Sequence, residues 1–203
     1  MNDRAIKTER ECWKKVLILL LYFTSYRLVF VDETAFYTHM APRYGYARGS
    51  RRLRAPVRKR SPRYTLIGAM GLCGMLAASL LNRAMTERDW VSWVKECLLP
   101  SLPARSVVIW DNLNIHYNKE AIKALEDAGH VVLHQSRYSP DLNPIEMAWN
   151  KMKTLVRQAQ PKGAALMRQA VDAAWNAITK DDILQFFGRV FKHIYSPGFQ
   201  GSL

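Results

Sequence analysis

The sequence predicts an α/β fold built on one mixed sheet. Three apolar runs, at residues 28–33, 64–71 and 75–81, follow one another without a helical pattern between them. Leu72-Cys73-Gly74 joins the last two runs and suits a hairpin. Helical and strand patterns then alternate along the rest of the chain, and this alternation indicates parallel crossovers onto a sheet.

In the first half of the chain, a local feature of the sequence predicts each element. Residues 10–22 mix charge with apolar bulk and predict an N-terminal helix. The run 28–33 is apolar on both faces, as expected of a central strand. Residues 42–62, which begin at Pro42, predict a loop or a loose hairpin, because the segment contains two glycines and two further prolines. These are Gly45, Gly49, Pro56 and Pro62.

In the second half, Thr86 can cap a helix that runs to Leu98, and residues 107–110 form a short buried strand. Thr179 and Asp182 can cap the last helix in the same way. The remaining elements expected are a helix at 119–127 that stops at Gly129, a strand at 130–134, and helices at 144–159, 163–178 and 181–195.

Size and composition indicate a globular protein with a polyanionic partner. The chain has 203 residues, enough for one full core, and 49% of them are hydrophobic. Thirty lysines and arginines against 17 acidic residues give a net charge of +13. Such an excess favours nucleic acid or an anionic membrane surface as partner.

The positive charge is concentrated in residues 43–63, where no acidic residue occurs. A solvated surface would also show a run of charge. However, the run is almost entirely arginine, which forks onto phosphate and stacks on bases, and no amphipathic face suited to a membrane is visible. We therefore expect DNA contacts from Arg43, Arg48, Arg51, Arg52, Arg54, Arg58, Lys59, Arg60 and Arg63.

The cysteines and the longest apolar run indicate in which compartment of the cell the protein is found. Cys12, Cys73 and Cys97 are odd in number and far apart, which suits neither a zinc site nor a disulfide scaffold. The apolar run 16–23 is too short to cross a bilayer, and no cleavable signal precedes it. We expect a soluble cytoplasmic protein with no membrane partner.

Three acidic residues stand where strands end or a helix begins. Asp32 lies in LVFVDET, Asp111 in VVIWDNLNIH and Glu146 in YSPDLNPIEMAWNKMK, and thirty-four residues separate the last two. A buried carboxylate is costly unless it is paired or binds a metal. Carboxylates that converge from strands and a helix can hold two divalent cations and activate an oxygen for attack on phosphate.

The two strand acids have structural alternatives. Asp32 would also suit a turn just past the strand, and its neighbour Glu33 is a competing ligand on the opposite face. Asp111, with Asn112 after it, would also suit an Asx-type turn. His116 alone is more often a packing or surface histidine than a ligand.

Glu146 also has a structural alternative. Asn143 as N-cap, Pro144 at the first helical position and Glu146 at the third form a capping-box pattern. Glu146 also lies on the rim of the buried stripe of its helix, where a carboxylate can face a cleft. Asn150 and Lys153 share that edge, and Lys153 is a further candidate for DNA contact.

Taken together, two strand acids and one helix acid beside an arginine-rich segment predict metal-assisted phosphodiester chemistry. Carboxylate oxygens are hard donors, which suit Mg²⁺, with Mn²⁺ as a substitute, rather than Zn²⁺. One of two ions would activate water or a DNA 3′-hydroxyl, and the other would stabilise the leaving oxygen.

The motifs VFVDET, RYGYARG at 43–49, IWDNLNIH and YSPDLNPIEMAWNKMK resemble the catalytic domain of bacterial insertion-sequence transposases of the mariner superfamily. The resemblance covers residues 28–157. It implies a ribonuclease-H-like mixed sheet with flanking helices in residues 28–160, which include the basic loop 42–63. A helical lead-in at 1–27 and C-terminal helices at 161–203, packed on the same domain, complete the expected organisation.

The resemblance assigns Asp32, Asp111 and Glu146 as catalytic triad and metal ligands, and so favours Asp32 over Glu33. It implies cleavage at transposon ends, attack of the freed 3′-hydroxyl on target DNA, and a homodimer in the complex with double-stranded DNA. One segment departs from the family pattern: residues 134–137 read HQSR, where Leu-Pro is usual.

Members of this family carry helix-turn-helix domains ahead of the catalytic domain, and about thirty residues before Asp32 cannot hold them. We therefore expect the catalytic half of a split-frame element, an engineered fragment or a decayed copy. A separate polypeptide would then recognise the transposon ends, in a bacterial cytoplasm and associated with the nucleoid. Two other functions fit the same residues: a catalytically silent DNA-binding or assembly protein, and a nuclease that is structure-specific or acts on RNA–DNA hybrids.

Overall fold

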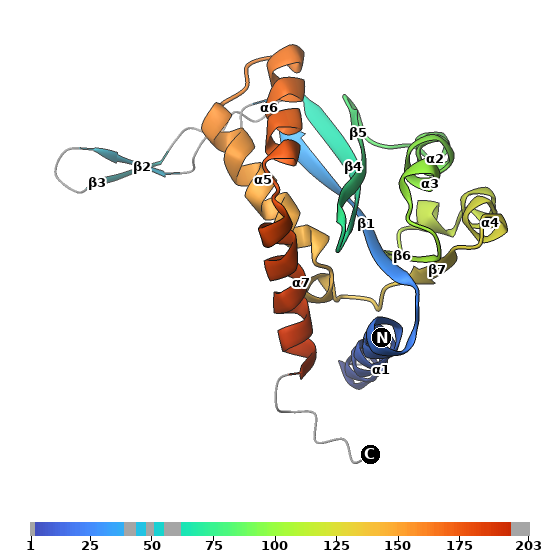
Figure 1. Cartoon of the computed structure of the whole chain (residues 1–203). Coiled ribbons are helices and arrows are strands. Elements are labelled where there is room, and N and C mark those ends of the chain that lie inside the picture. The colour runs from blue at the N-terminus through green and yellow to red at the C-terminus, as the bar shows by residue number, and fades with distance from the viewer. Residues whose placement is uncertain (1–2, 39–43, 48–50, 55–61, 196–203) are drawn as a thin grey trace.

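The computed structural model describes residues 3–38, 44–47, 51–54 and 62–195 (Figure 1). Its body is a five-stranded sheet in the order β5-β4-β1-β6-β7, and β2 and β3 form a separate two-stranded sheet. The strands are β1 (Arg27–Tyr37), β2 (Tyr44–Ala47), β3 (Arg51–Arg54), β4 (Arg63–Gly71), β5 (Gly74–Leu81), β6 (Ser106–Trp110) and β7 (Val131–His134). The β2–β3 pair confirms a hairpin within the basic segment.

The sheet is mixed, as predicted. β1 pairs antiparallel with β4 and parallel with β6, and β6 pairs parallel with β7. β1 is longer than expected because its pairing with β6 ends at Phe30, whereas its pairing with β4 continues to Tyr37 opposite Arg63. The parallel strands direct their carboxyl ends to one edge, where Asp111 directly follows β6.

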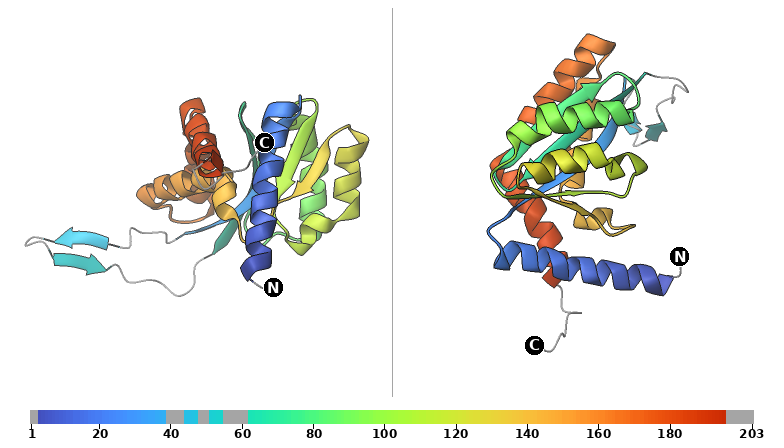
Figure 2. Two further views of the ribbon diagram at one scale, coloured as in Figure 1. Left: turned by 90° about the horizontal axis from the view of Figure 1, so that it is seen from below. Right: turned by 90° about the vertical axis from the view of Figure 1, so that its right-hand side faces the viewer.

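Helices cover both faces of the sheet (Figures 1 and 2). α5 and α7 pack on one face, and α2 and η1 on the other. The helices are α1 (Asp3–Phe23), α2 (Glu87–Trp93), η1 (Val94–Leu98), α3 (Leu99–Ser101), η2 (Asn114–Tyr117), α4 (Lys119–Asp127), η3 (Pro140–Leu142), α5 (Ile145–Ala159), α6 (Ala164–Asn176) and α7 (Lys180–Tyr195). No helix in these described ranges is long and apolar enough to span a membrane.

The local helix signals are largely confirmed. Thr86 and Asp89 form a capping box at α2, and Thr179 and Asp182 exchange the same pair of hydrogen bonds at α7. Gly129 takes the left-handed conformation after α4, with φ 83°. The helix expected to end at Leu98 is wrong in extent, because it continues through the π-helical turn η1 into α3.

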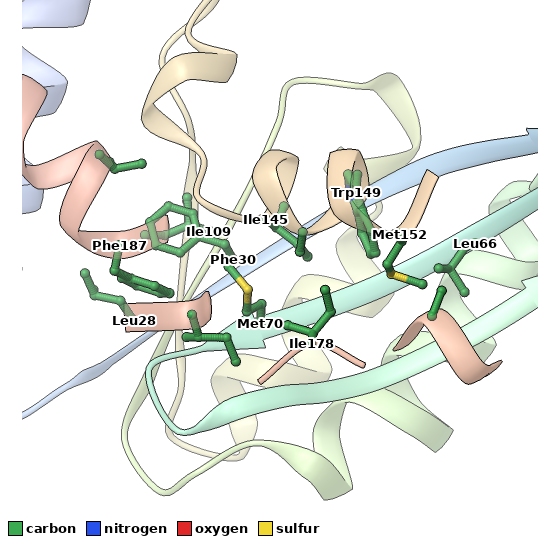
Figure 3. Packing of buried hydrophobic residues seen from close by; sticks show 14 of the residues in the cluster. Leu28, Phe30, Leu66, Met70, Ile109, Ile145, Trp149, Met152, Ile178 and Phe187 are labelled. Atoms are coloured by element: carbon green, nitrogen blue, oxygen red, sulfur yellow. The ribbon is translucent and has the colours of Figure 1, made fainter. Parts of the chain in front are cut away.

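β1 supplies both layers of the core, because successive side chains of a strand point to opposite faces. Leu28 and Phe30 face α5 and α7, and the Phe30 and Phe187 rings meet edge to face at 5.7 Å (Figure 3). Val29 and Val31 face α2. By the same alternation, the next two residues of the strand, Asp32 and Glu33, belong to different faces.

Gly68 allows α5 to approach the sheet closely. It lies opposite Asp32 in the β1–β4 ladder, and a Cβ atom there would stand 2.6 Å from the ring of Trp149. Trp149 is fully buried on α5 (Figure 3). The absence of a side chain at residue 68 therefore permits the indole of Trp149 to lie beside Asp32.

Candidate active site

The three acidic residues predicted from the sequence line one pocket of about 610 Å³. Asp32 comes from β1, Asp111 follows β6, and Glu146 stands in the first turn of α5. The loops after β6 and β7, at residues 112–117 and 135–143, contribute the rest of the wall. The fold thus brings together groups that are 114 residues apart in sequence, from residue 32 to residue 146.

Asp32 lies on the inner wall of the pocket. The indole Nε1 of Trp149 donates a hydrogen bond of 3.0 Å to its Oδ2. Burial, followed by the negative charges of Glu146 and Glu33, raises the pKa of Asp32 to about 8. The negative charges of Glu146 and Glu33 are therefore close enough to Asp32 to repel its ionised form.

Glu146 does not form the expected capping box. The backbone N–H of Asn143 donates to the carbonyl of Pro140 instead, at 3.1 Å, and Asn143 Oδ1 accepts from the N–H of Ile145 at 3.2 Å. Within the described part of the chain, the half-buried carboxylate of Glu146 has no hydrogen-bond or salt-bridge partner. It is therefore available to a ligand in the pocket.

Asp111 is held by a buried histidine. His116 Nδ1 lies 2.7 Å from Asp111 Oδ1, and the N–H of Leu113 donates to the same oxygen at 3.0 Å, so the Asx-type turn is also present. Burial raises the pKa of Asp111, but these hydrogen bonds outweigh burial and hold it below its ordinary value.

His116 also reaches the opposite face of β1. Its Nε2 lies 2.8 Å from Glu33 Oε1, and its ring packs on Trp90 with 4.3 Å between centroids. Burial lowers the pKa of His116, but the hydrogen bonds to Asp111 and Glu33 outweigh it and raise the pKa to about 9. Glu33 therefore supports Asp111 through His116, whereas Asp32 alone of this pair faces the pocket.

The acidic side chains of the pocket offer the type of ligand atom that a divalent cation prefers. Asp32 and Glu146 offer carboxylate oxygens that repel each other, and an ion between them would remove that repulsion. In the ranges that the structure describes, no three His, Cys, Asp or Glu side chains form a ready-made metal cluster. The three carboxylates line one pocket, where Asp32, Asp111 and Glu146 are the residues that would hold an ion.

The segment that departs from the family pattern is held by hydrogen bonds. The amide of Gln135 donates to the carbonyl of Ser139, and the hydroxyls of Ser136 and Ser139 lie 2.7 Å apart, with all three residues buried. These bonds shape the loop before α5 and hence the wall of the pocket that carries Glu146.

The predicted DNA contacts are described only in part. Arg51, Arg52 and Arg54 lie on β3, and Arg63 is exposed at the start of β4. Lys153 lies on α5, about two turns after Glu146, and is not among the residues that line the pocket. Arg43, Arg48, Arg58, Lys59 and Arg60 lie outside the described residues.

The metal-assisted phosphodiester chemistry predicted from the sequence gives His116 a testable role. Replacing His116 by glutamine is expected to reduce such cleavage about 10- to 100-fold, because residues that orient metal ligands have effects of this size. The Mn²⁺ concentration needed for half-maximal cleavage should rise, since Asp111 loses the group that orients it. His130→Gln is a suitable control, because His130 lies just before β7, at the opposite end of the strand from His134. An unchanged Mn²⁺ requirement in the His116 variant would contradict this role.

The fold and the site together define a class: an α/β protein of ribonuclease-H-like fold, with two acidic residues from the sheet and one from a helix around a single pocket. Residues 27–165 match the family described as DDE superfamily endonuclease, and the chain belongs to this family. No curated protein matches the chain.

Solved structures with a similar fold include several of Mos1. The Mos1 strand transfer complex has a TM-score of 0.78 at 17% identity over 96% of this chain and 60% of that chain. The mariner Mos1 paired end complex with Mg has a TM-score of 0.76 at 18% identity, over 100% and 65%. The catalytic domain of Mos1 mariner transposase has a TM-score of 0.65 at 14% identity, over 96% and 92%. The chain thus spans about 60% of the full Mos1 chain and most of its catalytic domain.

Proposed function

We propose that the chain is the catalytic domain of a DNA transposase, which cleaves strands at the ends of a mobile element and joins the freed 3′-hydroxyl to target DNA. The observation that carries this proposal is the convergence of Asp32, Asp111 and Glu146 on one pocket in a DDE superfamily endonuclease. The similarity in fold to Mos1 strand transfer and paired end complexes supports it.

In this proposal Asp32, Asp111 and Glu146 hold two Mg²⁺ or Mn²⁺ ions. When bound, such ions supply Lewis acidity at the scissile phosphate and lower the pKa of an attacking oxygen. Trp149 orients Asp32 through its indole N–H, and His116 orients Asp111. Glu146 completes the set from α5, where its carboxylate has no competing partner among the described residues.

The substrate proposed is double-stranded DNA, both as transposon end and as target. The net charge of +13 and the arginines of β3 support a partner with a phosphate backbone. A homodimer on DNA, a separate end-recognition polypeptide, and a place in the bacterial insertion-sequence branch, acting at the nucleoid, complete the proposal. They rest on the motif resemblance alone.

The test is Mn²⁺-dependent nicking of supercoiled plasmid by the wild type, by Asp111→Asn and by the matched surface variant Asp172→Asn. Asp172 is exposed on α6, away from the pocket. Nicking by the wild type and Asp172→Asn, but not by Asp111→Asn, would support the proposal. Equal nicking by all three would place the activity elsewhere.

Two further measurements on the same proteins, of DNA binding and of RNA–DNA hybrid cleavage, would detect other functions. Salt-sensitive DNA binding without nicking would favour a catalytically silent DNA-binding or assembly protein. Cleavage of RNA–DNA hybrids, with no joining of a 3′-hydroxyl to a second DNA, would favour a hybrid nuclease.

A further inference from the structure

Helix α1 lies outside the matched family region 27–165. Two of its side chains form hydrogen bonds with the loop that precedes α5. The guanidinium of Arg10 donates to the carbonyl of Tyr138 at 2.5 Å and to the hydroxyl of Ser139 at 2.9 Å. Its two nitrogens also meet the carboxylate of Asp141, at 3.0 and 2.7 Å. Figure 2 shows α1 lying alongside this loop, which is coloured between yellow and orange.

A second contact comes from the preceding residue of α1. Glu9 Oε1 accepts a hydrogen bond from the backbone N–H of Arg137 at 3.1 Å. Arg10 and Glu9 thus bind residues on both sides of Tyr138. Arg10 makes a forked, charge-assisted contact with Asp141, which is the strongest kind available to this side chain.

Tyr138 takes a backbone conformation that is rare for a bulky residue. Its φ is 53°, in the left-handed region. Such conformations persist where surrounding contacts determine them, and they concentrate at binding sites. Here the contacts are those of Arg10 and Glu9 on the residues around it.

The Tyr138 side chain lines the pocket that holds Asp32, Asp111 and Glu146, yet it is 75% exposed. In the described part of the chain it has no hydrogen bond or ring contact. Tyr117, in the same pocket, is different: its ring stacks on His134 at 4.2 Å and its hydroxyl donates to Asn112. Tyr138 is therefore the pocket tyrosine that is free to bind a ligand.

We propose that Tyr138 contacts DNA in the active site, by stacking on the nucleotide beside the scissile phosphate, and that Arg10 is its positioning residue. This inference rests on the proposed function. The pocket is acidic. A neutral aromatic ring can bind a nucleotide there without bringing in further charge, and it does not compete with the carboxylates for the metal ions. Aromatic side chains stack on any base, so the contact does not depend on DNA sequence.

The experiment measures affinity for a fluorescein-labelled DNA duplex with a central nick, with Ca²⁺ in place of Mn²⁺. Tyr138→Ala is expected to weaken binding about 5- to 50-fold, and Tyr138→Phe to restore it, because stacking needs the ring and not the hydroxyl. Phe23→Ala is the matched control, since Phe23 has nearly the same exposure, 76%, but lies at the end of α1 and outside the pocket.

Arg10→Gln tests the positioning role. It should weaken binding to an extent similar to Tyr138→Ala, and the double variant should be no weaker than either single variant, because both changes remove one contact. In plasmid nicking, Tyr138→Ala should raise the DNA concentration for half-maximal rate by the same factor. Equal melting temperatures of Tyr138→Ala and the wild type would exclude misfolding as the cause.

The outcomes separate this inference from the proposed function. Wild-type nicking together with unchanged affinity in Tyr138→Ala would overturn the inference and leave the transposase proposal intact. Failure of the wild type to bind DNA would overturn both. Additive losses in the double variant would overturn the positioning role of Arg10, and a change in oligomeric mass in Tyr138→Ala without a change in affinity would identify Tyr138 as a protein contact instead.

Discussion

Asp32→Asn is expected to stabilise the metal-free protein while it abolishes metal-dependent cleavage. Burial and the charges of Glu146 and Glu33 make the ionised form of Asp32 unfavourable in the fold. Asparagine has the same shape and can still accept the hydrogen bond from Trp149. Cleavage should fall at least about 10³-fold, since a proposed ligand of the metal ions is lost.

The stability effect has a definite dependence on pH. The pKa of Asp32 is raised to about 8 in the fold. Its contribution to the free energy of unfolding is therefore fully present below the pKa that Asp32 has in the unfolded chain, and it is lost as pH rises towards 8. The metal-free wild type should therefore lose stability between about pH 4 and pH 8. Asp32→Asn should lack this loss and melt roughly 3–8 °C higher at pH 8, which corresponds to about 1–3 kcal/mol.

Thermal melts with and without Mn²⁺ check this prediction. Mn²⁺ should raise the melting temperature of the wild type at pH 8 and have little effect on Asp32→Asn. The exposed variant Asp172→Asn, which changes the net charge equally, should behave as the wild type in both conditions. A lower melting temperature for Asp32→Asn than for the metal-free wild type would show that Asp32 is not a repelled carboxylate.

Neutralising the arginines of β3 is expected to produce the largest loss of DNA affinity. Alanine at Arg51, Arg52 and Arg54 removes three of the positive charges of a segment without acidic residues. The slope of log affinity against log salt should become shallower by about three, and affinity at about 0.1 M salt should fall roughly 10- to 100-fold.

The matched control removes three exposed positive charges elsewhere, by alanine at Arg88, Lys119 and Arg168. It gives the same change in net charge, so a specific DNA contact of β3 predicts a much smaller effect in the control. Equal losses in both triple variants would mean that net charge alone, and not the hairpin, determines the affinity. The measurement is a salt titration of binding to a labelled duplex.

The elements, and the positions of the three acidic residues on them, could be predicted because their signals are local. Alternation along β1 separates Asp32 from Glu33, and the strand at 107–110 leads directly to Asp111. The capping box, an alternative for Glu146 that rests on equally local evidence, does not form. The backbone N–H of Asn143, which a capping box would bond to Glu146, is already bonded to the carbonyl of Pro140 in η3.

The supporting contacts could not be predicted, because nothing near them in sequence signals their partners. The sequence around His116 indicates only a packing or surface histidine. Its contact with Glu33, 83 residues away, forms because β1 and η2 are adjacent in the fold. The contact of Arg10 with Asp141 spans 131 residues. Single polar residues on a helix surface have many possible partners, and the fold alone selects one.

The β1–β4 register has a consequence for how such proteins can diverge. Tyr37 pairs with Arg63, so the chain leaves the sheet after β1 and returns to it at the neighbouring position of β4. The segment 38–62 therefore starts and ends at neighbouring, paired positions of β1 and β4. Its length or charge can change without shifting the strand pairing that places Asp32. Exchange of residues 38–62 between relatives should therefore alter the preferred DNA partner while it preserves the chemistry of the pocket.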